Sequence, residues 1–262
     1  MGLRNVNRVI SVSMILVAAG IGLPWLKGKY DHRPVWWDSV WHYMVHTGLK
    51  ETARMAVISV FGAAVIGVVL GTLLTIRFWP SRALIRSYIE VWRGLPIIVT
   101  IFLIYFALPQ ALPNVVKDIT HISKLQAFQA ATVGLILWGS AQVAEATRGA
   151  VESIPREQHE AASALGFGWI GRHVYVILPQ AVRRLLPPLI SLLVNVIQNT
   201  TIAALIGVGE VLETGNRSTE RLLFTTGDAH AAFPIFAVVM GVFFVISFPL
   251  TRLAAFLESR RA

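Results

Sequence analysis

The sequence predicts an all-α integral membrane protein, with residues 1–262 forming a single transmembrane domain. Hydrophobic residues make up 55% of the chain and charged residues only 14%, whereas a soluble domain averages about 25% charged residues. The mean hydropathy is +0.63. A helix that crosses about 30 Å of hydrocarbon needs about 20 mostly apolar residues. Six runs approach that length: 9–26, 55–76, 94–112, 127–144, 186–208 and 233–251.

The first run, 9–26, has two interpretations. Arg4 and Arg8 precede it, as basic residues precede the apolar core of a signal peptide. Pro24, Trp25 and Leu26 stand where a cleavage site of small residues would lie. We therefore expect a retained N-terminal span, and a cleaved signal peptide is the alternative.

The second run, 55–76, contains no charged residue and carries Gly67 and Gly71 four positions apart. Small residues at this spacing let a second helix approach closely in a membrane. The alternative is the ordinary frequency of glycine in membrane helices. Either interpretation concerns packing and not chemistry.

The third and fourth runs are less polar than the fifth. The third, 94–112, opens at the segment Arg93-Gly94-Leu95-Pro96. The fourth, 127–144, is followed by Glu145 and Arg148, whose spacing predicts an ion pair on one helix, with a gating role as the alternative. Polar side chains of the fourth run are interpreted as contacts between helices: Gln129, Thr132, Ser140 and Gln142.

The fifth run, 186–208, carries a polar cluster near its end. Asn195 and Asn199 share one helical face, and Gln198 flanks it. Amides can bind both the carboxylate and the ammonium group of an amino acid, although such residues also form hydrogen bonds between helices. The candidate pathway residues are Asn195, Gln198, Asn199, Thr200 and Thr201, together with Thr100 of the third run.

The basic residues orient the chain. The net charge is +9, and cytoplasmic segments of membrane proteins are enriched in Lys and Arg. Placing both termini in the cytoplasm, with the sixth run 233–251 leading to the C-terminus, puts most of the basic residues inside. This bias accounts for the positive charge without nucleic acid as a partner. The inside residues are Arg4, Arg8, Arg77, Arg82, Arg86, Arg93, Arg148, Arg156, Arg172, Arg183, Arg184, Arg252, Arg260 and Arg261.

A cytoplasmic loop over 150–185 is too polar to cross the bilayer, and it reads as two short helices. Pro155 suits the start of the first helix. Gly166 and Gly168 supply the turn, since glycine tolerates positive φ at a helix end. The second helix is predicted over 169–178, where Pro179 ends it.

The same loop contains a spaced motif: Glu160-Ala161-Ala162, then Gly166, then Leu178-Pro179. It resembles the EAA signature of ABC-type importer permeases, with Val176 where isoleucine is usual. The resemblance implies that this loop is a coupling helix that docks into a groove on an ATPase subunit. The short side chains of Ala161 and Ala162 fit such a groove, and Glu160 offers a carboxylate to a basic partner group.

Further segments narrow the resemblance to the polar amino-acid branch, the histidine, glutamine and glutamate permeases. They are Arg93-Gly94-Leu95-Pro96, Gln198-Asn199-Thr200-Thr201-Ile202 and Ile206-Gly207-Val208-Gly209-Glu210. The resemblance covers 47–258 and implies a five-helix ABC type I importer core, to which 9–26 adds an extra helix. It implies a glutamate- or glutamine-like substrate, and a basic amino acid or an opine is the alternative.

The resemblance also implies partners and a location. We expect a separate ATP-binding subunit that carries ATP and Mg, so that this chain holds no cofactor and has no enzyme activity of its own. A second permease subunit, identical or a sister chain, would complete the pathway. An extracytoplasmic solute-binding protein would deliver the amino acid, and the assembly would lie in the inner (cytoplasmic) membrane of a prokaryote.

Other classes of protein fit the sequence less well. The only Gly-Lys pair is Gly28-Lys29, followed by Tyr30, so the chain lacks a phosphate-binding loop for ATP. The runs contain no intramembrane catalytic motif, and a channel or ion-coupled transporter would not explain the cytoplasmic motif. His42 and His46 could ligate a metal, but the tryptophans beside them favour a helix at the membrane interface, so we expect no metal site.

Overall fold

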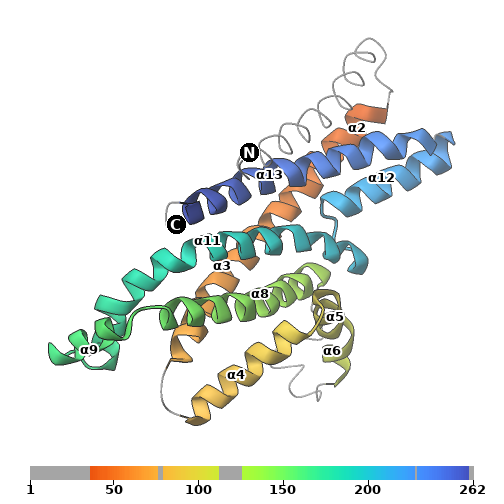
Figure 1. The fold of residues 1–262 in the computed structure, drawn as a ribbon. Coiled ribbons are helices and arrows are strands. Elements are labelled where there is room, and N and C mark those ends of the chain that lie inside the picture. The colour runs from red at the N-terminus through yellow and green to blue at the C-terminus, as the bar shows by residue number, and fades with distance from the viewer. Residues whose placement is uncertain (1–35, 76–78, 112–125, 228, 260–262) are drawn as a thin grey trace.

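The computed structural model describes residues 36–75, 79–111, 126–227 and 229–259. The regular structure in these ranges is helical throughout, without a β-strand (Figure 1). The first predicted span, 9–26, lies outside the described residues. The other five predicted spans all fall on helices, which confirms the all-α membrane fold class.

The first described helix is longer than the predicted second span. Helix α2 (Trp36–Tyr43), the π-helical segment η1 (Met44–Leu49) and α3 (Lys50–Leu73) follow one another without a break. Together they form a helix of 38 residues, Trp36–Leu73. The tryptophan-rich segment expected at the interface is therefore a continuation of the span, and His42 and His46 stack within it at 4.2 Å between ring centroids.

The third span is preceded by a helix that the apolar runs did not reveal. Helix α4 (Trp79–Gly94) ends at Gly94, and the apolar helix begins only at α5 (Ile97–Phe102). The axis turns by 108° between them, because Pro96 adopts an extended backbone that cannot continue a helix. The π-helical η2 (Leu103–Ala107) and α6 (Leu108–Ala111) complete the span.

The fourth span is helix α8 (Ala127–Glu152), which begins as predicted and extends beyond 144. Gln129 was expected to contact another helix, but it caps α8 instead, its Oε1 accepting from the backbone N–H of Gln126 at 3.1 Å. Ser140 does contact another helix, since its hydroxyl lies 2.7 Å from that of Tyr88 in α4. The interhelical role is therefore confirmed for Ser140 and wrong for Gln129.

The loop over 150–185, which the resemblance identifies as the coupling loop, does not consist of the two short helices that were predicted. Its first helix, α9 (Arg156–Ala164), is as predicted. The second does not end at Pro179: α10 (Trp169–Gly171), the π-helical η4 (Arg172–Ile177), α11 (Leu178–Asn199) and the 3-10 helical η5 (Thr200–Ile206) form one helix, Trp169–Ile206. Pro179 stands in the first turn of α11, one residue after the π-helical segment, where the N–H of Leu178 bonds to the carbonyl of His173. The helix continues through Pro179, which has no N–H to donate to the regular ladder.

The C-terminal part contains a second helix that the sequence did not reveal. Helix α12 (Val211–Thr226) is too polar to be recognised as a span and lies between η5 and the 3-10 helical η6 (Ala229–Ala231). Helix α13 (Ala232–Ser259) contains the predicted sixth span. In Figure 1, α12 and α9 lie at opposite ends of the bundle.

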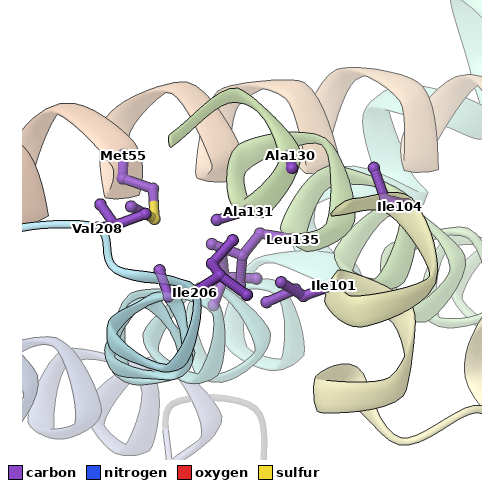
Figure 2. Close-up of a cluster of buried hydrophobic side chains, with 10 residues drawn as sticks. Met55, Ile101, Ile104, Ala130, Ala131, Leu135, Ile206 and Val208 are labelled. Atoms are coloured by element: carbon purple, nitrogen blue, oxygen red, sulfur yellow. The ribbon is translucent and has the colours of Figure 1, made fainter. Parts of the chain in front are cut away.

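Among the described residues, four helices are long and apolar enough to cross a membrane, and the bent pair formed by α4 and the helix after it would make a fifth. Helix α8 is central, with contacts to α3, α4, α5 and α11 (Figure 1). The main core forms where α8 meets α3, α5, α11 and η5 (Figure 2). It contains Met55, Ile101, Ile104, Ala130, Ala131, Leu135, Val196, Ala203, Ile206 and Val208.

The spaced glycines of α3 face α8, which favours the close-packing interpretation over ordinary glycine frequency. A Cβ on Gly67 would lie 2.7 Å from the backbone oxygen of Ser140, and one on Gly71 would lie 2.3 Å from that of Ala144. Both distances are far below van der Waals contact, so only glycine permits this approach of the two backbones. The pair thus fixes how α3 and α8 pack.

Candidate coupling site and substrate pathway

Helix α9 presents its signature residues in two directions. Pro155 precedes the first turn with φ −54°, a conformation preset by its ring. Glu160 and Ala161 are exposed, and Glu160 is only loosely paired with Arg156 at 3.7 Å. Ala162 is 2% exposed and faces the rest of the protein. One side of the helix therefore anchors it, and the other side is free to meet a partner.

The turn after α9 requires the glycine of the motif. Gly166 has φ +81°, a left-handed conformation that residues with a Cβ rarely adopt. Its N–H donates to the carbonyl of Ser163 at 3.0 Å, and the N–H of Phe167 donates to that of Ala162 at 3.1 Å. These two bonds form a Schellman motif, which satisfies carbonyls at the helix end. Gly168 has φ −65°, so its predicted role as a left-handed turn residue is wrong.

The coupling loop is bound to the bundle by side chains outside the motif. Arg184 of α11 donates to the carbonyl of Ser153 and, at 3.0 Å, to its hydroxyl. Gln180 donates to the side chain of Gln158 at 3.3 Å. The motif's own Leu178 is half-buried and Pro179 is exposed in the first turn of α11. The loop is thus held between the end of α8 and the start of α11.

The predicted ion pair on α8 is present and belongs to a larger network. Arg148 lies 2.6 Å from Glu145 and also bonds Glu152. Arg93, at the end of α4, lies 3.8 Å from Glu145. From the sequence, only Arg148 was expected to pair with Glu145, because Arg93 is distant along the chain. The network links α4 to α8 where α4 ends.

The polar cluster of the fifth span divides between two environments. Asn195 and Gln198 are exposed on the surface of this single chain, and Asn199 is half-buried. Gln198 also donates to the hydroxyl of Ser247 in α13 at 3.3 Å, so it contacts another helix. The exposed amides form a polar face within 185–199, a mostly apolar stretch of this helix, as a polar pathway between two subunits would need.

The threonines of the candidate set direct their hydroxyls to backbone carbonyls three or four residues earlier, and Thr201 is half-buried whereas Thr200 and Thr100 are buried. Thr200 is buried and its hydroxyl donates to the carbonyl of Ile197 at 2.8 Å, while that of Thr201 donates to Gln198 at 2.9 Å. Thr100 is fully buried in α5, with its hydroxyl 3.5 Å from the carbonyl of Pro96. The structure therefore places Asn195, Gln198 and Asn199 near one another, and Thr100 on a different helix.

A buried carboxylate at the opposite end of the bundle was not singled out as a site residue. Glu210 is 0% exposed and caps α12, accepting from the N–H groups of Leu212 at 2.9 Å and Glu213 at 2.8 Å. Thr52 of α3 accepts from the N–H of Val211 at 3.0 Å beside it. Burial raises the pKa of Glu210 to about 7, and the two N–H groups only partly oppose this. A glutamate directly before an amphipathic 16-residue segment was the available signal.

Comparisons with known proteins identify the family that has this arrangement. Residues 63–262 match the family of binding-protein-dependent transport system inner membrane components. The glutamine transport system permease GlnP of Escherichia coli K12 is 34% identical over 83% of this chain and 95% of its own length. The chain belongs to this family of permeases. A probable glutamine ABC transporter permease of Bacillus subtilis, GlnM, is 29% identical over 83% of this permease and 93% of its own length.

The fold is also similar to those of solved ABC transporter structures. The permease resembles a chain of the crystal structure of an amino acid ABC transporter with histidines, with a TM-score of 0.67 and 25% identity, covering 83% of this permease and 94% of that chain. The methionine ABC transporter MetNI, in an inward-facing conformation, shares the fold at a TM-score of 0.61 and 20% identity. The predicted family, the importer-permease fold and the multi-pass inner-membrane location are confirmed.

Glu210 makes the stability of the permease depend on pH. Its folded carboxyl holds a proton up to about pH 7, whereas its ordinary pKa is 4.5. The folded state therefore binds more protons between these values, so the contribution of Glu210 to the free energy of unfolding is fully present below pH 4.5 and is lost as the pH rises through about 7. At roughly 1.4 kcal/mol per pKa unit, the free energy of unfolding falls by an amount on the order of 3 kcal/mol over this range.

We expect Glu210→Gln to remove most of this dependence. The unfolding temperature of the detergent-solubilised permease would be measured from about pH 5 to about pH 8, the range in which the carboxyl titrates. Glu220→Gln, a change on an exposed part of the same helix, is the control and should retain the wild-type slope. An unchanged slope in Glu210→Gln would show that Glu210 is not the titrating group.

Proposed function

We propose that this permease imports a glutamine-like polar amino acid by alternating access, driven by a separate ATPase. The observation that carries the proposal is the exposed face of α9, with Glu160 and Ala161 free at one end of the bundle. Closure of two ATPase subunits around ATP and Mg would move this helix, and the bundle would switch the side to which its cavity opens. The similarity to GlnP of Escherichia coli supports the substrate class.

The surface around α9 fits a protein partner. Leu165 is 79% exposed, Ile170 70% and Tyr175 72%. Large apolar side chains are expected to face lipid within the membrane, but these three lie on the polar loop outside the predicted spans. Exposed apolar groups rimmed by polar residues mark interaction sites, so we assign this surface to the ATPase. Both termini would then lie in the cytoplasm, on the same side as the ATPase.

The pathway would form between two permease subunits. Asn195 and Gln198 are exposed in this single chain, and a second copy or a sister permease would cover them. Their amides supply donors for the carboxylate and acceptors for the ammonium group of a zwitterionic substrate. An extracytoplasmic binding protein would dock at the end of the bundle that carries α12, opposite α9.

Import should require ATP inside and the binding protein outside. We expect proteoliposomes that contain the complete transporter to accumulate labelled glutamine only when ATP is enclosed with Mg. Excess unlabelled glutamine should block uptake, and glutamate should compete more strongly than arginine. Uptake down a gradient without ATP would instead support a channel, and strong competition by arginine would replace the substrate class with basic amino acids.

A further inference from the structure

A buried histidine lies where the coupling loop meets the helix bundle. His173 is 3% exposed and belongs to η4, the π-helical segment between α10 and α11. Its Nδ1 lies 2.9 Å from the carbonyl oxygen of Trp169. Its Nε2 lies 3.1 Å from the hydroxyl of Thr75, which follows α3 and is 98 residues away in the sequence. One side chain thus connects the loop to a membrane helix.

The ring of His173 also contacts both parts of the loop. It lies 4.2 Å from the ring of Trp169 in α10, tilted by 30°. The ring of His159, in α9, is 6.2 Å away in an edge-on arrangement. Displacement of α9 or α10 would therefore be felt at His173. Neither contact involves the exposed face that we assign to the ATPase.

The hydrogen bonds at this junction allow two arrangements. A carbonyl only accepts, so Nδ1 of His173 carries the proton, and Nε2 of the neutral ring can only accept. The single proton of the Thr75 hydroxyl has two acceptors, since the carbonyl of Thr72 lies 2.7 Å from the same oxygen. The hydroxyl can close the link to His173 or bond within its own helix. The π-helical turn that holds His173 is a form often found at functional sites.

The end of α3 is not isolated from the rest of the bundle. Gly71, four residues before Thr75, brings α3 into backbone contact with α8. A shift at Thr75 would therefore move two packed helices together, because closely packed backbones cannot slide independently. Contiguous contacts of this kind, with a bistable element within them, are the physical basis for coupling between distant sites.

We infer that His173 is a positioning residue that transmits movement of the coupling loop to α3 through Thr75. The inference rests on the proposed function, because it assigns a route to the ATP-driven movement. His173 touches neither substrate nor the ATPase face. Loss of the hydrogen bond between His173 and Thr75 should leave the rate of ATP hydrolysis unchanged and lower the amount of amino acid imported per ATP hydrolysed.

The test uses the complete transporter in proteoliposomes and measures amino acid imported per ATP hydrolysed. Thr75→Val keeps the shape of the side chain and removes the hydroxyl, and His173→Phe keeps a buried ring and removes both nitrogens. Each should lower the ratio about fivefold, the effect of losing the hydrogen bond between Thr75 and His173 that both variants lack. His173→Phe also loses the bond to the carbonyl of Trp169, which lies within the loop. Thr72→Val is the matched control, since its hydroxyl donates within α3, to the carbonyl of Val68 at 2.8 Å, and makes no other hydrogen bond to the described residues.

The double variant separates a link from two independent defects. If the two side chains act through one contact, Thr75→Val with His173→Phe should be no worse than either single change. Additive losses, or an unchanged ratio in Thr75→Val, would overturn the inference. A lower thermal stability with an unchanged ratio would reduce His173 to a packing role. Failure of the wild-type transporter to import with ATP would contradict the proposed function instead.

Discussion

Ala161→Trp is expected to abolish ATP-driven import while the permease remains folded. Ala161 is exposed on α9, so a large side chain has room in the free protein. In a partner's groove the same side chain would be overpacked, at a cost of about 1–3 kcal/mol. That cost corresponds to roughly a fivefold to 150-fold loss of ATPase binding. Co-purification of the ATPase and uptake in proteoliposomes would measure the two effects.

The control for this change is Ala83→Trp, which places the same side chain on an exposed position of α4 outside the coupling loop. It should retain both the ATPase and import. Ala162→Trp differs in kind, because Ala162 is buried and the change should disrupt the loop itself. Normal ATPase binding and import in Ala161→Trp would show that this face of α9 is not the docking surface.

Gly71→Ala should sharply reduce the amount of folded permease, even though it adds only one methyl group. That methyl would lie 2.3 Å from the backbone oxygen of Ala144 and 2.6 Å from Cβ of Thr147. Backbone atoms cannot turn aside as a flexible side chain can, so α3 and α8 would have to separate. Overpacking of this kind costs about 1–3 kcal/mol or more. Gly67→Ala should act similarly, since Ser140 and Val143 lie as close to it.

Gly149→Ala is the matched control on α8. A Cβ there meets nothing within 4 Å, and alanine is favoured over glycine in a helix by about 1 kcal/mol. It should leave stability unchanged or raise it slightly, as read from the unfolding temperature and the monodisperse fraction in detergent. If Gly71→Ala were as stable as Gly149→Ala, the close approach of α3 and α8 would not be needed for the fold.

Much of this architecture can be predicted because it follows from local composition. An apolar run of about 20 residues predicts a span wherever it occurs, and five such runs fall on the helices described. The spacing of Gly67 and Gly71 suggested a close helix contact, with ordinary glycine frequency as the alternative. The motif around Glu160 and Gly166 was identified by its resemblance to a family signature, and the turn at Gly166 could be predicted because such a turn is fixed by adjacent residues.

The predictions were wrong where the folded structure overrode a local sequence signal. Pro179 was expected to end a helix, but it follows a π-helical segment and begins the regular turns of α11. Gln129 looked like an interhelical contact, but its backbone position made it a cap. Helices α4 and α12 were not predicted, because amphipathic segments do not stand out in a search for apolar runs.

The sequence by itself determined the class of protein, the positions of the apolar runs that fall on helices within the described residues, and the motif that carries the family resemblance. Only the tertiary structure decided which polar groups meet. Gln198 and Ser247 are 49 residues apart in the sequence, His173 and Thr75 are 98 apart, and Val211 and Thr52 are 159 apart. Such pairs leave no local pattern, because a hydrogen bond depends on where helix packing brings two side chains and not on the residues beside them.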